Sequence, residues 1–284
     1  MKCGAWHGQL GLEPSFNLYI KHLCDIFDEV KRVLKPTGTC WVSLGDTYSG
    51  SGCGTNDYKT EASRSIQGKN TQLNKTDGIA QRIKEVPAKS LCLIPFRFAL
   101  EMIKRGWILR NVIIWHKPNC MPSSAKDRFT VDFEYLFFFV MNRKYYFVPQ
   151  YEEYNGPINR WGGPKIKFNT KKQEDYLKMQ KISRTSSLRA GGDCRPYPIG
   201  RNKRCVWLIP TTPFPDAHFA TFPAKLCETP IKSGCPPNGI VLDPFMGSGT
   251  TGLTALKLGV NFFGIEANPK YIEMARKRMG QISK

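Results

Sequence analysis

Apolar residues recur at helical spacing in four stretches of the chain. The longest, Phe16–Leu34, follows Ser15, whose hydroxyl is suited to cap a helix N-terminus. A second amphipathic helix is predicted within Ser90–Trp107. Two more are predicted near the C-terminus, one after Thr250 and one from Pro269.

Short β-rich runs alternate with these helices. They are Thr39–Leu44, Trp107–Trp115, Glu134–Val148, Ile240–Leu242 and Val260–Glu266. The third run is long enough for a strand hairpin, with its turn at Asn142. Strands that alternate with helices predict an α/β fold with a doubly wound, mostly parallel sheet, in a single domain that spans residues 1–284.

Two stretches lack this periodicity. Residues 49–86 are rich in Gly, Ser, Asn and Lys, which predicts a loop insertion. Within residues 150–205, the stretch Gly156–Arg204 holds thirteen Lys or Arg residues against three acidic residues, a net charge of +10, with aromatic residues interleaved. This stretch is either a solvated, flexible insertion or a segment that contacts nucleic acid, because cations neutralise phosphates and aromatic rings stack on bases.

The whole chain is strongly basic, with a formal net charge of +19 over 284 residues. This excess favours a polyanionic partner, most often nucleic acid and less often an anionic membrane surface. No apolar stretch approaches the roughly 18 residues of a membrane span, and no secretory leader is recognisable. The ten cysteines include no CxxC pair, which predicts reduced thiols and no metal site. We therefore expect a cytoplasmic protein without a membrane partner.

A glycine-rich turn separates a predicted strand from the following helix near the end of the chain. Asp243 ends the strand, and Gly247 and Gly249 allow the backbone to turn tightly and approach a ligand at the helix N-terminus. The Lys of a phosphate-binding P-loop and the GxGxxG pattern are both absent. Glu266 ends the next strand, where a carboxylate can accept hydrogen bonds from ribose hydroxyls. This combination favours S-adenosylmethionine, an adenosine cofactor without phosphates, over a turn that merely connects two elements.

The same region carries a family resemblance. VLDPFMGSGTTGLTALKLGVNFFGIEANPKYIEMARKRM, residues 241–279, closely resembles the cofactor motif of amino-directed DNA methyltransferases, which methylate N4 of cytosine or N6 of adenine. Residues 30–48, 106–140 and 206–226 resemble other blocks of this family, in one consistent order. The resemblance implies a Rossmann-like methyltransferase fold that is circularly permuted, with the cofactor-binding part, residues 206–284, placed last. It implies S-adenosylmethionine as cofactor and double-stranded DNA as substrate, with N4 of cytosine slightly favoured.

The resemblance also implies which residues form the two binding sites. The expected cofactor-binding residues are Asp243, Pro244, Phe245, Gly247, Ser248, Gly249, Thr250, Glu266 and Asn268, with His218 and Thr221 from the segment before the motif. Residues 150–205 fall where target-recognition segments lie in this family. The expected DNA-binding residues are Lys117, Arg128, Lys165, Lys167, Lys171, Lys172, Arg184, Arg189, Arg201, Lys203 and Arg204. For Lys117 and Arg128, a solvated surface position is an equal alternative.

The catalytic motif of the family is not found. That motif is an acidic, Asn or Ser residue followed by Pro-Pro and an aromatic residue, and neither CPPN at Cys235–Asn238 nor DPF at Asp243–Phe245 fits it. We expect the motif, and the central strand that leads into it, to lie upstream of Met1. Three alternatives follow: a misassigned start, a truncated and inactive remnant, or one part of a split enzyme that needs an N-terminal fragment. A cognate restriction endonuclease is a further partner that the sequence leaves open. Asp46 is either a target-pocket residue or a turn former, and His116 is interpreted as a strand-end residue that packs beside Trp115.

Overall fold

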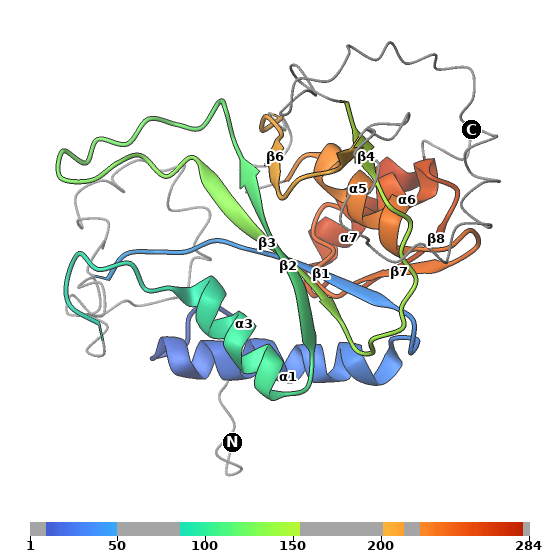
Figure 1. Cartoon of the computed structure of the whole chain (residues 1–284), viewed down its shortest axis with the longest axis horizontal. Helices are drawn as coiled ribbons and strands as arrows, with labels where there is room; N and C mark the ends of the chain where they lie inside the picture. The colour runs from blue at the N-terminus through green and yellow to red at the C-terminus, as the bar shows by residue number, and fades with distance from the viewer. Residues whose placement is uncertain (1–9, 50–85, 154–200, 213–221, 281–284) are drawn as a thin grey trace, which may run out of the picture.

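The computed structural model describes residues 10–49, 86–153, 201–212 and 222–280, which form α-helices packed against β-sheets (Figure 1). The helices are α1 (Phe16–Val33), α3 (Ile94–Lys104), α5 (Ala224–Gly234), α6 (Thr250–Lys257) and α7 (Pro269–Gly280). The strands are β1 (Thr39–Leu44), β2 (Ile108–His116), β3 (Phe133–Val140), β4 (Tyr151–Glu152), β5 (Arg201–Asn202), β6 (Val206–Leu208), β7 (Ile240–Asp243) and β8 (Asn261–Gly264). No helix in these ranges is long and apolar enough to cross a membrane.

The predicted helices and most predicted strands are confirmed, with shifts of a few residues at their ends. Helix α1 begins where the pattern places it, because the Ser15 hydroxyl accepts a hydrogen bond from the backbone N–H of Leu18. Its apolar stripe is buried against α3, and the helix ends at Val33 before the turn at Pro36.

The larger sheet has four strands in the order β1-β3-β2-β6, and the expectation of a mostly parallel sheet is wrong for it. Strand β3 is antiparallel to both of its neighbours, while β2 and β6 are parallel. The physical reason is the connection from β2 to β3. Residues 117–132 contain no helix, so the chain returns beside β2 without the crossover that a parallel strand requires.

The predicted hairpin within Glu134–Val148 is also wrong. Both edges of β3 are already paired with β1 and β2, so no edge remains for a second strand of a hairpin. After Asn142 the chain instead makes single backbone hydrogen bonds, from the N–H of Tyr146 to the carbonyl of Thr37 and from that of Val148 to the carbonyl of Ser233.

Apolar side chains cover both faces of the four-stranded sheet. On one face, α1 and α3 bury a cluster that includes Phe27, Phe98 and Phe139. On the other face, Trp115 and Phe138 pack with Leu226 of α5. The sheet is therefore enclosed between helical layers, as the α/β prediction requires.

The carboxyl-terminal part forms a second, two-stranded sheet in which β7 and β8 are parallel (Figure 1). Its own core joins Ile231 of α5, Ala255 of α6 and Val260. Contacts between this part and the rest of the structure include a hydrogen bond from the Thr39 hydroxyl of β1 to the carbonyl of Gly234 in α5, and the rings of Phe27 in α1 and Phe245, whose centres lie 6.4 Å apart. Among the described strands, β1 and β7 do not pair with each other. The circular permutation and the missing central strand stay predictions.

The two ends of the predicted recognition segment, residues 150–205 (the basic segment), are paired with each other. Strand β4 pairs antiparallel with β5, and the backbone N–H of Lys203 donates to the carbonyl of Gln150 at 2.9 Å. Residues 154–200, which carry most of the segment, lie outside the described residues. The division into residues 49–86, 150–205 and 206–284 therefore remains a prediction.

Candidate functional site

The glycine-rich turn lies between the end of β7 and the start of α6. Asp243 closes the strand, and its Oδ1 accepts a hydrogen bond from the backbone N–H of Phe245 at 2.9 Å. Pro244 lies between these two residues, half-buried. The N–H of Met246 donates to the carbonyl of Ile265 at 3.0 Å, which fixes the turn to the end of β8. The turn therefore stands at the carboxyl ends of two parallel strands, where ligands of α/β proteins bind.

Both glycines of the turn adopt backbone conformations that other residues rarely take. Gly247 has φ of 51° and Gly249 has φ of 81°. A Cβ on Gly249 would lie 2.8 Å from the Cβ of Ala275 in α7, so this glycine lets the turn pack against that helix. A Cβ on Gly247 would meet only the carbonyl oxygen of Phe245, at 3.9 Å. The space above Gly247 is open, as expected where a ligand approaches the backbone.

Glu266 follows β8 and faces the turn. Its Oε2 accepts a hydrogen bond from the backbone N–H of Gly247, and its Oε1 accepts one from that of Asn268, both at 2.8 Å. Each carboxylate oxygen can accept more than one hydrogen bond, so capacity for ribose hydroxyls remains. Burial, and then the charge of Glu266, raise the pKa of Tyr271. Glu266 thus holds the turn in addition to the ribose contact expected of it.

Asn268 has a local structural task. Its Oδ1 accepts a hydrogen bond from the backbone N–H of Lys270 at 3.0 Å, which caps the start of α7. Phe245, by contrast, has 45% of its surface exposed.

Arg278, in α7, was not identified from the sequence. Its Nη1 donates to the carbonyl oxygen of Ser248 at 2.6 Å, to the Ser248 hydroxyl at 2.9 Å and to the Thr250 hydroxyl at 3.3 Å. Burial lowers the pKa of Arg278. The only signal in the sequence is a cation in the last turn of a helix, which usually indicates an interaction with the helix dipole.

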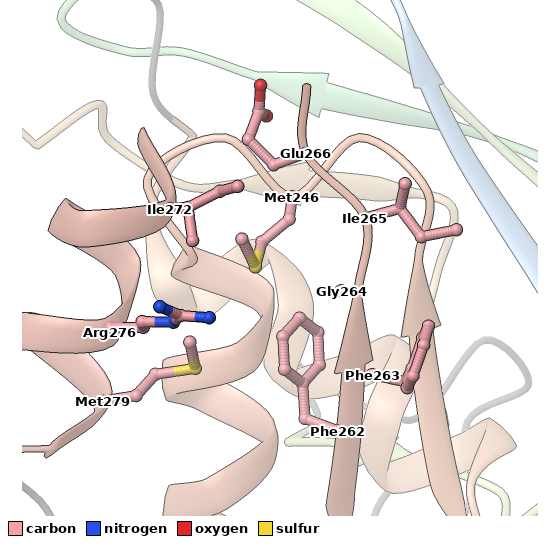
Figure 2. A pocket seen from close by; sticks show the side chains of 9 residues that line it. All are labelled: Met246, Phe262, Phe263, Gly264, Ile265, Glu266, Ile272, Arg276 and Met279. Atoms are coloured by element: carbon pink, nitrogen blue, oxygen red, sulfur yellow. The ribbon is translucent and has the colours of Figure 1, made fainter. Parts of the chain in front are cut away.

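A hollow of about 420 Å³ lies beside the turn, between β8 and α7. Figure 2 shows Arg276 and Met279 reaching from α7 toward Phe262 of β8, with Glu266 at one end. Most of its lining is apolar, and Met246 of the turn contributes to it. Met246 of the turn and Glu266 both line this hollow, so it borders the glycine-rich turn.

Asp46 lies just beyond the carboxyl end of β1. Its Oδ1 accepts hydrogen bonds from the backbone N–H of Thr47 at 2.9 Å and of Ile94, at the start of α3, at 3.0 Å. Its Oδ2 is buried and has no hydrogen-bond partner among the described residues. The structure therefore shows a turn-stabilising role for one oxygen, while the buried second oxygen calls for an explanation.

The described candidates for DNA contact are already engaged with protein groups. Lys117 forms an ion pair with Glu134 and lies 4.5 Å from the centre of the Trp115 ring, with 18% of its side chain exposed. Arg128 stacks over Tyr48 at 3.8 Å. Such contacts position a cation without removing its charge, so phosphate binding by these two residues stays a prediction.

The expected DNA-binding residues at the end of the basic segment also contact protein groups. Arg201 and Arg204 both donate to Oε1 of Glu152, at 2.8 and 2.5 Å. Lys203 lies 5.4 Å from the Trp207 ring centre. Two guanidinium groups share one carboxylate, which leaves net positive charge at this point.

Other expected site residues lie outside the described part of the chain. They are His218, Thr221, Lys165, Lys167, Lys171, Lys172, Arg184 and Arg189. His116 ends β2, and its Nε2 is 3.1 Å from Oδ2 of Asp132, which agrees with a strand-end position. In the ranges that the structure describes, no three His, Cys, Asp or Glu residues are grouped so as to hold a metal ion.

Comparison with known proteins shows to which class of protein this chain belongs. Residues 6–277 match the model of a family described as DNA methylase, so the chain belongs to this family. The type II methyltransferase M.SmaI of Serratia marcescens is 34% identical over 96% of this chain and 77% of its own length.

Solved structures with the same fold are also known. The PvuII DNA methyltransferase, described as cytosine-N4-specific, aligns with a TM-score of 0.58 at 19% identity, over 97% of this chain and 74% of its own. A putative DNA modification methylase of Thermus thermophilus, complexed with S-adenosyl-L-methionine, gives 0.52 at 19% identity over 98% and 83%. At this identity the likeness shows the fold alone, a Rossmann-like methyltransferase fold with a mixed sheet.

Proposed function

We propose that this protein is an S-adenosylmethionine-dependent DNA methyltransferase that modifies an exocyclic amino group of a base. The main observation behind this proposal is the turn at Gly247–Gly249, with Glu266 beside it, at the carboxyl ends of β7 and β8. Membership of the DNA methylase family supplies the reaction class. The net charge of +19 supports a nucleic-acid substrate, and hence a cytoplasmic location with access to DNA.

Several features support S-adenosylmethionine as the ligand of the turn. The open space above Gly247 lets a ligand approach the backbone N–H groups at the start of α6. Glu266 retains acceptor capacity for ribose hydroxyls, and no Lys follows the turn to bind phosphates. The methylase from Thermus thermophilus, which has this fold, was solved with this cofactor.

The residues of this chain act by binding and orienting. Bound S-adenosylmethionine supplies an activated methyl group for direct transfer to the amino nitrogen. Glu266 would orient the ribose through its carboxylate, and the exposed ring of Phe245 would offer a contact to the adenine. On the DNA side, the target base leaves the stack so that its amino group can reach the methyl group.

Asp46 is our candidate acceptor for that amino group among the described residues. Its Oδ2, which no other described residue contacts by a hydrogen bond, lies beyond the carboxyl end of β1, and a carboxylate oxygen suits an N–H donor. We place N4 of cytosine ahead of N6 of adenine as the methylated position.

Analysis of methylated nucleosides tests the proposal. The purified chain is incubated with duplex DNA and S-adenosylmethionine, and the DNA is digested and examined by mass spectrometry. N4-methylcytosine or N6-methyladenine is expected, and Gly247→Val should abolish it because a branched side chain fills the open space and opposes a φ of 51°. Methyl transfer to protein, or to C5 of cytosine, would contradict the proposal.

A second candidate function is binding of DNA and cofactor without turnover, by an inactive remnant or one part of a split enzyme. No acidic, Asn or Ser residue followed by Pro-Pro-aromatic occurs in the sequence. In addition, β1 and β7 each have an edge that no other described strand pairs with, and unpaired backbone groups are costly to bury.

Addition of a segment in trans separates the two candidates. A fragment of an active family member that carries Ser-Pro-Pro-Tyr and the strand before it is co-expressed with the chain. Methylation only in the presence of the fragment supports the split enzyme, whereas an ordinary turnover rate by the chain alone excludes the second candidate. A cognate endonuclease stays a separate proposal.

A further inference from the structure

Arg278 connects the last turn of α7 with the turn that follows β7. A single nitrogen, Nη1, reaches the carbonyl oxygen and the hydroxyl of Ser248 and the hydroxyl of Thr250, within 3.3 Å in each case. The contacts span 28 to 30 positions of sequence, so they are tertiary contacts that depend on how α7 packs.

The two residues that Arg278 contacts lie in the glycine-rich turn and at the start of α6. Ser248 lies between the two glycines, and Thr250 is the first residue of α6. The backbone N–H groups at the start of a helix have no partner within the helix. Their direction depends on the conformation of the turn, and two glycines make that conformation easy to change.

The turn is also held by Glu266, whose Oε2 accepts the hydrogen bond of the Gly247 N–H. An acceptor from the end of β8 and a donor from α7 thus fix consecutive residues of the turn. Ala275, one helical turn before Arg278, backs Gly249 at a distance that leaves no room for a Cβ. Helix α7 therefore supports the turn by packing and by hydrogen bonding.

We propose that Arg278 is a positioning residue for cofactor binding, which keeps the turn in the conformation that accepts S-adenosylmethionine. This inference rests on the proposed assignment of the turn as the cofactor site. In this role Arg278 acts through Ser248 and Thr250, which its hydrogen bonds hold so that the space above Gly247 stays open.

The expected loss of cofactor affinity depends on the fraction of molecules whose turn is in the binding-competent conformation. When only a fraction of molecules has the binding-competent turn, the apparent dissociation constant rises by the inverse of that fraction. Loss of a charged NH2 donor that is shared among three acceptors is expected to reduce the competent fraction enough to weaken binding roughly 10- to 100-fold.

The experiment compares Arg278→Met with Lys277→Met, a matched control at the exposed neighbouring position of α7. Calorimetry measures S-adenosylmethionine affinity, and a filter assay measures duplex DNA affinity. We expect weaker cofactor binding in Arg278→Met alone, with DNA affinity unchanged in both variants. In Arg278→Ala, which leaves space for a small cation, millimolar methylguanidinium should restore cofactor affinity but should have no effect on the wild type.

Wild-type cofactor affinity in a folded Arg278→Met variant, or no recovery with methylguanidinium, overturns the inference. Near-ultraviolet circular dichroism shows whether Arg278→Met folds; if it does not, Arg278→Lys takes its place, because the shorter lysine side chain cannot reach the same three acceptors. Weaker cofactor binding by Arg278→Lys supports the inference, and unchanged affinity overturns it. Gly247→Val separates this inference from the proposed function. If Gly247→Val also binds normally, the turn is not the cofactor site; if only Gly247→Val loses binding, the role of Arg278 alone is wrong.

Discussion

Alanine at Gly249 and alanine at Gly247 should have different effects, although both residues have positive φ. The left-handed conformation costs about 1–2 kcal/mol for an alanine at either site. At Gly249 the new Cβ would also lie 2.8 Å from the Cβ and 3.2 Å from the Cα of Ala275, and a backbone atom cannot rotate away. Such overpacking adds about 1–3 kcal/mol. At Gly247 the nearest atom is 3.9 Å away, so no second contribution is expected.

Thermal unfolding of the two variants measures the difference. One kcal/mol shifts Tm by about 2–4 °C in a domain of this size, so Gly249→Ala should unfold several degrees below Gly247→Ala. In calorimetric titration with S-adenosylmethionine, Gly247→Ala should lose affinity without the additional loss of stability expected for Gly249→Ala. Equal Tm values for the two variants would refute the packing argument. Wild-type cofactor affinity in Gly247→Ala would refute the argument that a ligand uses the open space.

Further variants test other contacts of the site. Glu266→Ala should weaken cofactor binding by about 1–3 kcal/mol, measured by calorimetry, because a charged acceptor is lost; unchanged affinity would contradict its role. Asp46→Asn should keep its two backbone hydrogen bonds through the side-chain carbonyl, so Tm should hardly change while methyl transfer falls; retained transfer would exclude Asp46 as acceptor. Deletion of Lys165–Arg204 should flatten the salt dependence of duplex binding, because fewer counterions are released, and an identical slope would make the segment a bystander. At pH 8, maleimide should label exposed Cys205 well before Cys40, because burial raises the pKa of the Cys40 thiol to about 12; equal rates by peptide mass spectrometry would contradict this.

Local patterns predicted the elements well where local physics decides them. Ser15 caps α1 by its own hydroxyl, and the β-rich run Thr39–Leu44 is a strand over the same residues. The orientation of β3 could not be predicted in this way. Its apolar run has the same composition whether its neighbours are parallel or antiparallel; the orientation follows from the helix-free connection after β2 and from pairing with β1, which is distant in the sequence.

In the site, too, some residues could be predicted from the sequence and others could not. Asp243, Gly247, Gly249 and Glu266 were predicted from the sequence, and the structure brings them together at the ends of β7 and β8. Arg278 was missed because its contacts depend on the packing of α7, which no local pattern encodes. The cap that Asn268 forms on α7 is local, yet a family pattern emphasised ligand contact at that position instead.

Hydrogen–deuterium exchange with and without S-adenosylmethionine tests most directly whether the cofactor lies at the carboxyl ends of β7 and β8. We expect added cofactor to slow exchange in peptides that cover residues 243–250 and 264–268, and to leave the middle of α3 unchanged. Gly247→Val should remove this protection. Protection confined to other peptides, or none at saturating cofactor, would contradict the assignment of the site.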